Sequence, residues 1–221
     1  MIDKNFTVIY ACFIFTIVLL IALGFQSCLF LRFYPSYLYH DNIVKQGLTE
    51  PTRIILFDNL ESSLLFVWVA VGACLNDAFA YFVGVFFGRN KMNERISPKK
   101  TWEGFFGGVI LTSIVLSGWA ILQDLLSGGA HPILAGVLDI KHFYHVIILS
   151  TLIPLVSVLG DLVFSSIKRF YGIKDFSNIM PGHGGILDRV DSILFAMITA
   201  AIYIRIFYDF AGTGLGGFIL P

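Results

Sequence analysis

Residues 174–192 read KDFSNIMPGHGGILDRVDS, a polar stretch whose residue types could bind phosphate and a metal ion. Carboxylates with few soft ligands around them suit a hard divalent cation, most often Mg2+. The basic side chains of this region, Lys168, Arg169, Lys174 and Arg189, suit phosphate oxygens. A glycine-rich turn that opens a helix also offers backbone N–H groups to an anion. The stretch therefore indicates a site for a polyphosphate.

Helical spacing places several of these groups on common faces. Asp161, Ser165 and Lys168 are separated by four and three residues and share one face of a helix. Asp188 and Asp191, three residues apart, share a face at the start of the next helix. We expect these helix ends, together with that of a third helix that carries Asp77, to point carboxylates at a common cytoplasmic pocket.

Asp77 supplies a further carboxylate, in the middle of the apolar segment ACLNDAFAYFVGVFFG. It shares a helical face with Tyr81, Gly84 and Gly88. An ionisable residue at membrane depth suggests function, because it is expensive to bury there. A structural carboxylate paired with another helix is the alternative for Asp77 and for Asp161. For the two glycines, plain helix packing and close ligand approach both remain open.

Two further groups have more than one interpretation. His183, between Gly182 and the pair Gly184 and Gly185, is a general base, a phosphate donor or a structural residue. The segment ISPKKTWEG adds Lys99 and Lys100 near the headgroup level, where an ordinary basic anchor to anionic lipid is the alternative role.

The elements that must position these residues are membrane helices. The 221-residue chain is 57% hydrophobic and only 14% charged, whereas soluble domains are about 25% charged. Its net charge is zero, so nothing points to nucleic acid. The three cysteines lie inside apolar runs without the spacing of a disulfide framework or a zinc site.

Hydropathy predicts an all-α, polytopic bundle of about five spans. We expect them over 6–31, 63–88, 104–125, 143–164 and 190–209, the last being the least apolar. The uncharged run 6–31 exceeds the core of a cleavable signal peptide, so we interpret it as a retained span. Loops 89–103 and 165–189 hold nine of the fifteen basic residues, and the positive-inside rule puts both in the cytoplasm. We divide the chain into an N-terminal span and loop (1–62), one membrane domain (63–209) and a tail (210–221).

The segment SSIKRFYGIKDFSNIMPGHGGILDRVDS closely resembles the signature of CDP-diacylglycerol synthases, the phosphatidate cytidylyltransferase family. That signature runs Ser-x-apolar-Lys-Arg, then Lys-Asp, then His-Gly-Gly-apolar-x-Asp-Arg-apolar-Asp. The upstream stretch NDAFAYFVGVFFGRNKMNERISPKKTWEGFFGG is also similar to the family, so the resemblance covers about residues 70–195. Met180 departs from the usual Leu, Ile or Phe. Residues 1–60 are not recognisable from sequence.

The resemblance implies the reaction of CTP with phosphatidic acid to give CDP-diacylglycerol and pyrophosphate. It further implies Mg2+ dependence, a polar cavity open to the cytoplasm, often a homodimer, and a bacterial cell membrane rather than the endoplasmic reticulum. On this basis Asp161 and Asp188 hold Mg2+, with Asp77 and Asp191 as ligands or close behind them. The basic residues named above, including Lys168, Arg169, Lys174 and Arg189, bind the CTP phosphates and the lipid headgroup, while Ser165 and His183 orient them.

Three rival functions are weighed against this interpretation. CDP-alcohol phosphotransferases also use intramembrane aspartates, but their pattern needs an Asp-Gly pair that this sequence lacks. A carrier would use Asp77 and Asp161 to line a path, and it predicts repeats and broken helices. Pro154 is a possible helix break, but no repeat accompanies it. An inactive scaffold is the third rival.

Overall fold

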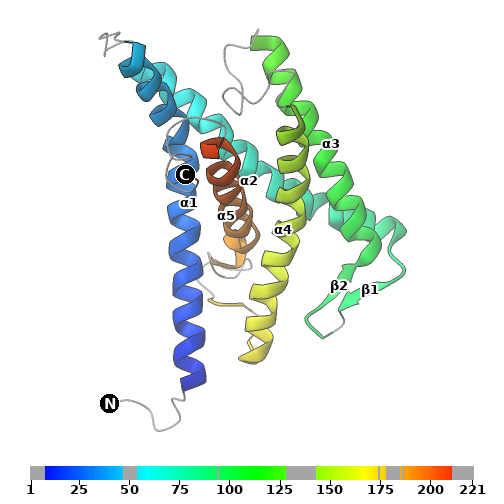
Figure 1. The fold of residues 1–221 in the computed structure, drawn as a ribbon. Helices are drawn as coiled ribbons and strands as arrows, with labels where there is room; N and C mark the ends of the chain where they lie inside the picture. Colours follow the sequence, from blue (N-terminus) through cyan, green and yellow to red (C-terminus); the bar gives the residue numbers. More distant parts are fainter. Residues whose placement is uncertain are drawn as a thin grey trace.

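The computed structural model describes residues 8–46, 54–93, 95–127, 143–173, 175–177, 185 and 187–210. Five helices and one two-stranded hairpin make up this part of the chain (Figure 1). In order they are α1 (Val8–Gln46), α2 (Ile54–Phe87), β1 (Lys91–Asn93), β2 (Ser97–Thr101), α3 (Trp102–Ser127), α4 (Phe143–Phe170) and α5 (Leu187–Phe210). The predicted all-α membrane bundle is confirmed, with the hairpin as the one addition among the described residues.

Within the part of the chain that the structure describes, four helices are long and apolar enough to cross a membrane, over Tyr10–Phe33, Leu64–Phe87, Trp102–Gln123 and Tyr144–Phe170. They correspond to the first four expected spans. The fifth segment forms α5, but it is not among those four. Its uncharged centre is short and Arg205 lies near its end, so α5 meets the length for a span without the same hydropathy.

α1 and α2 both run beyond the spans expected for them. α1 continues to Gln46 and α2 begins at Ile54, so the predicted loop 32–62 is largely helical. Hydropathy marks only the part of a helix that can lie in lipid, and a helix need not end where the apolar run ends.

The helices pack closely, and buried polar groups tie them together. Trp68 of α2 is fully buried, and its indole N–H donates to the carbonyl of Leu116 in α3 at 3.1 Å. Asn76 of α2 donates to the carbonyl of Pro154, inside α4, at 3.2 Å. A Cβ on Gly160 of α4 would lie 2.7 Å from Phe195 of α5, so that crossing requires glycine. These contacts fix α2 against α3, α2 against α4, and α4 against α5.

The hairpin replaces the first basic loop, which hydropathy alone treats as irregular. β1 and β2 are antiparallel, with Lys91 opposite Thr101 and Asn93 opposite Ser97. The Asn93 side chain accepts from the backbone N–H of Arg95 at 3.1 Å, which is an Asx-type turn. The turn reverses the chain, so that β2 runs back towards the start of α3.

The two basic loops meet at one end of the bundle, as predicted. Arg169, at the end of α4, donates to the carbonyl of Ile96 in the hairpin turn at 3.3 Å. The start of α1 lies at the same end, because Phe13 stacks on Phe170 with ring centroids 5.0 Å apart. Figure 1 shows the beginning of α1, the end of α4 and the hairpin together at the lower side.

Candidate active site

A cavity of about 530 Å3 lies between the hairpin and helices α2, α3 and α4. One part of its wall is charged and carries Asp77, Lys99, Lys100 and Asp161. Most of the remaining wall is formed by apolar or small residues, namely Ala80, Tyr81, Gly84, Val85, Met92, Phe105 and Val158. The cavity can therefore accept a ligand with an anionic portion and a less polar portion.

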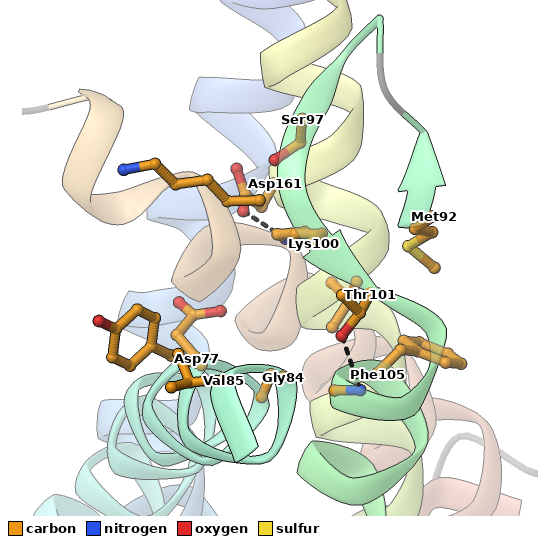
Figure 2. Close-up of a pocket in the computed structure, with 14 residues that line it drawn as sticks. Asp77, Gly84, Val85, Met92, Ser97, Lys100, Thr101, Phe105 and Asp161 are labelled. Carbon is orange, nitrogen blue, oxygen red and sulfur yellow. Dashed lines mark hydrogen bonds and ion pairs between the residues drawn. The ribbon is translucent and has the colours of Figure 1, made fainter. Parts of the chain in front are cut away.

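Asp161 and Lys100 form the charged centre of this cavity. The Lys100 Nζ lies 2.5 Å from Asp161 Oδ2 (Figure 2). Asp161 Oδ1 accepts from the Ser165 hydroxyl at 3.1 Å, which confirms that these two residues share a helix face. The Lys100 nitrogen is buried and makes no well-oriented hydrogen bond with the described residues. It retains donor capacity that an anionic ligand could use.

Asp77 faces the same cavity from α2. Figure 2 shows its carboxylate directed towards the side where Lys100 and Asp161 lie. Its Oδ2 accepts from the hydroxyl of Ser192, in α5, at 3.2 Å. The Asp77 carboxylate also interacts electrostatically with both Lys100 and Asp161. The predicted convergence of α2 and α4 carboxylates on one pocket is thus confirmed.

Asp191 adds a third carboxylate just behind this pair. It is only 5% exposed, and its Oδ1 accepts from the backbone N–H of Ser192 at 2.7 Å. The charges of Asp161 and Asp77 both act on it. Three acidic groups from three helices therefore interact electrostatically in this part of the bundle.

Asp188 has a different environment, because it joins the end of α4 to the start of α5. Its Oδ1 accepts from Lys168 Nζ at 2.8 Å. Its Oδ2 accepts from the backbone N–H groups of Phe176 and Gly185, each at 3.0 Å. Asp188 is not among the described residues that line the cavity. In this structure its carboxylate holds the chain around the polar loop in place.

The ion pair between Lys168 and Asp188 is almost completely buried, with side-chain exposures of 10% and 6%. Lys168→Met would leave the Asp188 carboxylate without its cation. We expect this change to lower the free energy of unfolding by about 3–5 kcal/mol, the usual cost of breaking a buried pair. Thermal unfolding in detergent measures it. The double variant Lys168→Met/Asp188→Asn should be more stable than Lys168→Met alone; a double variant with the summed loss would contradict the pairing.

Asp188 lies just before the span expected at 190–209, and its surroundings predict a pH dependence of stability. Burial raises the pKa of its carboxyl, but the bonds from Lys168 and from the N–H groups of Gly185 and Phe176 outweigh burial and hold the pKa below its usual 3.8. The folded state thus favours the ionised form, and its contribution is complete above the unfolded pKa. The stability difference between the native chain and Asp188→Asn should stay constant from about pH 8 to about pH 5 and shrink below about pH 4. A difference that already shrinks near neutral pH would contradict this assignment.

Arg169, predicted to bind phosphate, is instead engaged with backbone carbonyls. Besides its bond to Ile96, its Nη1 donates to the carbonyl of Ile173 at 3.2 Å. Arg169 is exposed, so its bonds with the hairpin turn and the end of α4 lie at the surface. Its role in substrate binding stays a prediction.

Several predicted site residues cannot be placed. Lys174, His183 and Gly184 lie outside the described residues, as does the side chain of Arg189. Gly185 is described: it is buried, and a Cβ there would lie 3.1 Å from both Asp188 Oδ2 and the backbone nitrogen of Ser177. This position accepts only a residue without a side chain unless its neighbours shift. The glycine therefore permits the close approach that Asp188 makes to the backbone.

The oxygen donors fit Mg2+ in type. Among the described residues, no three acidic, histidine or cysteine side chains form a metal site by themselves. Mg2+ rarely needs such a cage, because it keeps several waters and takes one or two carboxylates together with substrate phosphates. Asp77 and Asp161, on the wall of one cavity, fit that arrangement. Asp188, with three donors already on its carboxylate, fits it less well.

Sequence reasoning predicted Lys99, Lys100 and Asp191 but missed other residues that the hairpin and α5 contribute. Met92, Ser97 and Thr101 line the cavity, and Ser192 binds Asp77. The signal for Thr101 was available, because a threonine directly before an apolar helical run is a preferred N-cap. For Met92 and Ser97 no sequence signal existed, since the polar loop shows no strand alternation.

Comparison with known proteins gives a consistent picture. The model of the cytidylyltransferase family matches residues 2–207. A phosphatidate cytidylyltransferase of Haemophilus influenzae is 42% identical over 148 residues, which cover 66% of this chain and 46% of the relative. That of Bacillus subtilis is 42% identical over 121 residues, covering 55% and 40%, and that of Thermotoga maritima is 35% identical over 131 residues, covering 59% and 45%. The chain thus aligns with less than half the length of these relatives.

Proposed function

Because this chain belongs to the cytidylyltransferase family, we propose that it is a phosphatidate cytidylyltransferase, which converts CTP and phosphatidic acid into CDP-diacylglycerol and pyrophosphate. The observation that carries the proposal is the cavity in which Lys100 meets Asp161 and Asp77 beside an apolar wall. It combines the charges that a triphosphate and its metal need with surface that tolerates lipid. The relatives that share the match carry this activity in their names.

The proposed reaction is one displacement at phosphorus. An oxygen of the lipid phosphate attacks the α-phosphorus of CTP, the bond from that phosphorus to the β-phosphate oxygen breaks, and pyrophosphate leaves. Such transfers depend on positioning and charge neutralisation more than on covalent help from the protein. No covalent intermediate on a side chain is needed, so the residues act by binding and orienting.

The charged wall supplies those two functions. Lys100, with Lys99 beside it, binds phosphate oxygens of CTP, and the free donor capacity of Lys100 supports this role. Lys168 forms an ion pair with Asp188. It therefore contributes positive charge at the end of α4 but does not bind the substrate directly. Lys174, Arg189 and His183 remain proposed ligands of the phosphates and the headgroup.

We propose Asp161 and Asp77 as the carboxylates that hold Mg2+, with Asp191 behind them and Asp188 as the residue that fixes the loop. When bound, the metal neutralises charge on the triphosphate and on the leaving group. Asp161 would serve as a ligand of the metal, and the Lys100 ammonium group would then be available to bind phosphate. Activity should vanish with EDTA and return with added Mg2+; activity that persists in EDTA would overturn the metal assignment.

The site is proposed to face the cytoplasm of a bacterial cell. The two basic loops and the start of α1 share one end of the bundle, and basic loops favour the cytoplasmic side. The three relatives named above are bacterial, which supports a bacterial cell membrane over the endoplasmic reticulum. A homodimer is carried over from the family resemblance, and chemical cross-linking of the purified chain in detergent tests it.

The test is conversion of phosphatidic acid by the purified chain in detergent, with CTP and Mg2+. A carrier needs two sealed compartments and an enzyme does not, so CDP-diacylglycerol formed in micelles supports the enzyme. No product from well-folded protein, together with CTP-independent transport in vesicles, would favour the carrier instead. Omitting phosphatidic acid is the matched control, because the lipid phosphate is the proposed nucleophile.

A further inference from the structure

We propose that Thr101 is a positioning residue for the site: its side chain sits among three glycines and fixes β2 so that the neighbouring Lys100 reaches Asp161. The inference rests on the proposed function for the reaction it serves, but its geometry is independent of the substrate. Thr101 is the last residue of β2 and directly precedes α3. It therefore connects the hairpin to the helix bundle at the cavity wall.

The three glycines around Thr101 are Gly84 of α2, Gly88 just after the end of α2, and Gly104 of α3. A Cβ on Gly84 would lie 3.0 Å from the Thr101 Oγ1, and one on Gly104 would lie 2.9 Å from it. A Cβ on Gly88 would lie 2.8 Å from the Thr101 Cγ2. Any larger residue at these positions would have to displace the threonine or the backbone around it. The three glycines form a socket around this side chain, and a Cβ on Gly88 or Gly104 would also meet the carbonyl oxygen of Gly84 or Ala80, respectively.

Helix capping explains the hydroxyl group of Thr101 but not its methyl group. Its Oγ1 accepts from the backbone N–H of Gly104 at 3.1 Å, which is an ordinary N-cap of α3. Serine, aspartate or asparagine would cap equally well. The methyl group, in contrast, lies over Gly88, where it has no part in the cap. The socket therefore uses both branches of the side chain, and χ1 of a β-branched residue is stiff.

The hairpin contacts the helices at its base and at its turn. Of these attachment points, Thr101 is the one next to Lys100, which pairs with Asp161. At the base, Asn90 is bound to Glu103 through its backbone N–H at 3.1 Å and its side-chain nitrogen at 2.8 Å. At the turn, Arg169 connects the hairpin to α4 through its exposed bond to the carbonyl of Ile96. Lys100 lies between these attachments, next to the socket, so its reach to Asp161 depends on how Thr101 is seated.

The expected size of the effect follows from this adjacency. Residues of a strand are about 3.3 Å apart, so a displaced Thr101 moves the Lys100 backbone with it. A misplacement of about 1 Å at a reacting centre can lower the rate about a hundredfold. Thr101→Ala, which empties the socket, should lower kcat/KM about tenfold to a hundredfold. Thr101→Ser, which keeps the cap and loses the methyl, should lose less.

A double-mutant cycle separates positioning from a general structural role. In a Lys100→Met background, Thr101→Ala should cause little further loss, because the residue through which it acts is gone. If both losses multiply instead, Thr101 does not act through Lys100 and the proposal is overturned. Gly84→Ala allows a second double-mutant cycle with Lys100→Met. Alanine favours the helix, but its Cβ would lie 3.0 Å from Thr101 Oγ1 and would displace the threonine. The loss of activity caused by Gly84→Ala should therefore also disappear in the Lys100→Met background.

A cross-linking experiment tests the placement without activity. Cysteines replace Lys100 and Asp161 in a chain whose three native cysteines are alanine, and a short bis-maleimide reagent joins them. We expect the cross-linking rate to fall several-fold with Thr101→Ala and to recover only in part with Thr101→Ser, which keeps the cap but lacks the methyl group over Gly88. An unchanged rate in both would overturn the proposal. Because this readout needs no turnover, it remains decisive even if the chain shows no cytidylyltransferase activity.

Discussion

Asp161→Asn is expected to reduce kcat/KM about a thousandfold, which corresponds to about 4 kcal/mol of lost transition-state stabilisation. Asp161 is the residue at which the cavity's interactions meet: it contacts Lys100, accepts from Ser165 and acts electrostatically on Asp77 and Asp191. An amide cannot neutralise Lys100 or hold Mg2+ as a carboxylate does. Steady-state rates at saturating Mg2+, with equal amounts of folded protein, measure the loss.

The matched control is Asp124→Asn, the same chemical change near the far end of α3. It should leave the rate within about twofold, because about 20 helical residues, or about 30 Å of α3, separate it from Gly104 on the cavity wall. Changes far from a site usually have small effects. If Asp161→Asn retained full activity, Asp161 would be removed from the metal site. If both variants lost activity equally, the loss would reflect membrane insertion or folding.

Lys100→Met is expected to lower kcat/KM about a hundredfold, mainly through a higher KM for CTP. The change removes the cation whose nitrogen is buried in the cavity and has no well-oriented hydrogen bond to the described residues. Methionine keeps most of the side-chain length and apolar stem, so the cavity should keep its shape. A KM and kcat determination with CTP varied at fixed phosphatidic acid makes the measurement.

Lys99 provides an internal comparison for this prediction. It also lines the cavity but is exposed, whereas the Lys100 side chain reaches Asp161. Lys99→Met should therefore cause a clearly smaller rise in KM than Lys100→Met. Equal effects would mean that the two lysines act only as diffuse positive charge. A larger effect of Lys99→Met would contradict the geometry of the charged wall.

The bundle itself was within reach of sequence reasoning. Long apolar runs predicted four of the spans, and α3 and α4 begin within two residues of their expected positions. Helical spacing predicted that Asp161 and Ser165 share a face, and their side chains are hydrogen-bonded. These successes rest on the 3.6-residue period and on the length of a membrane crossing, both of which are local properties of the chain.

The partners of the charged groups were not predictable in the same way. Spacing along a helix says which side chains share a face, but it does not say which residue of another element each one meets. Thus Asp188 was predicted as a metal ligand, whereas the structure surrounds it with Lys168 and two backbone N–H groups. Lys100 was predicted to bind substrate, and its ion pair with Asp161 depends on a hairpin that the sequence does not signal.

The glycines of α2 illustrate the same limit. Sequence left open whether Gly84 and Gly88 serve helix packing or close approach of a ligand. Both positions pack against Thr101, and Gly84 also lies on the cavity wall. The answer depended on the hairpin, because only its return to α3 brings a threonine into the space that the missing side chains leave.

The most direct test of the account is the fate of two labels on CTP. The purified chain is incubated in detergent with phosphatidic acid and Mg2+, once with CTP labelled at the α-phosphorus and once with CTP labelled at the γ-phosphorus. We expect the α-label to enter the lipid fraction and the γ-label to leave as pyrophosphate. Both changes should be lost with EDTA and with Asp161→Asn. A γ-label in the lipid would show transfer to a different phosphorus, and absence of both labels from the lipid would contradict the proposed function.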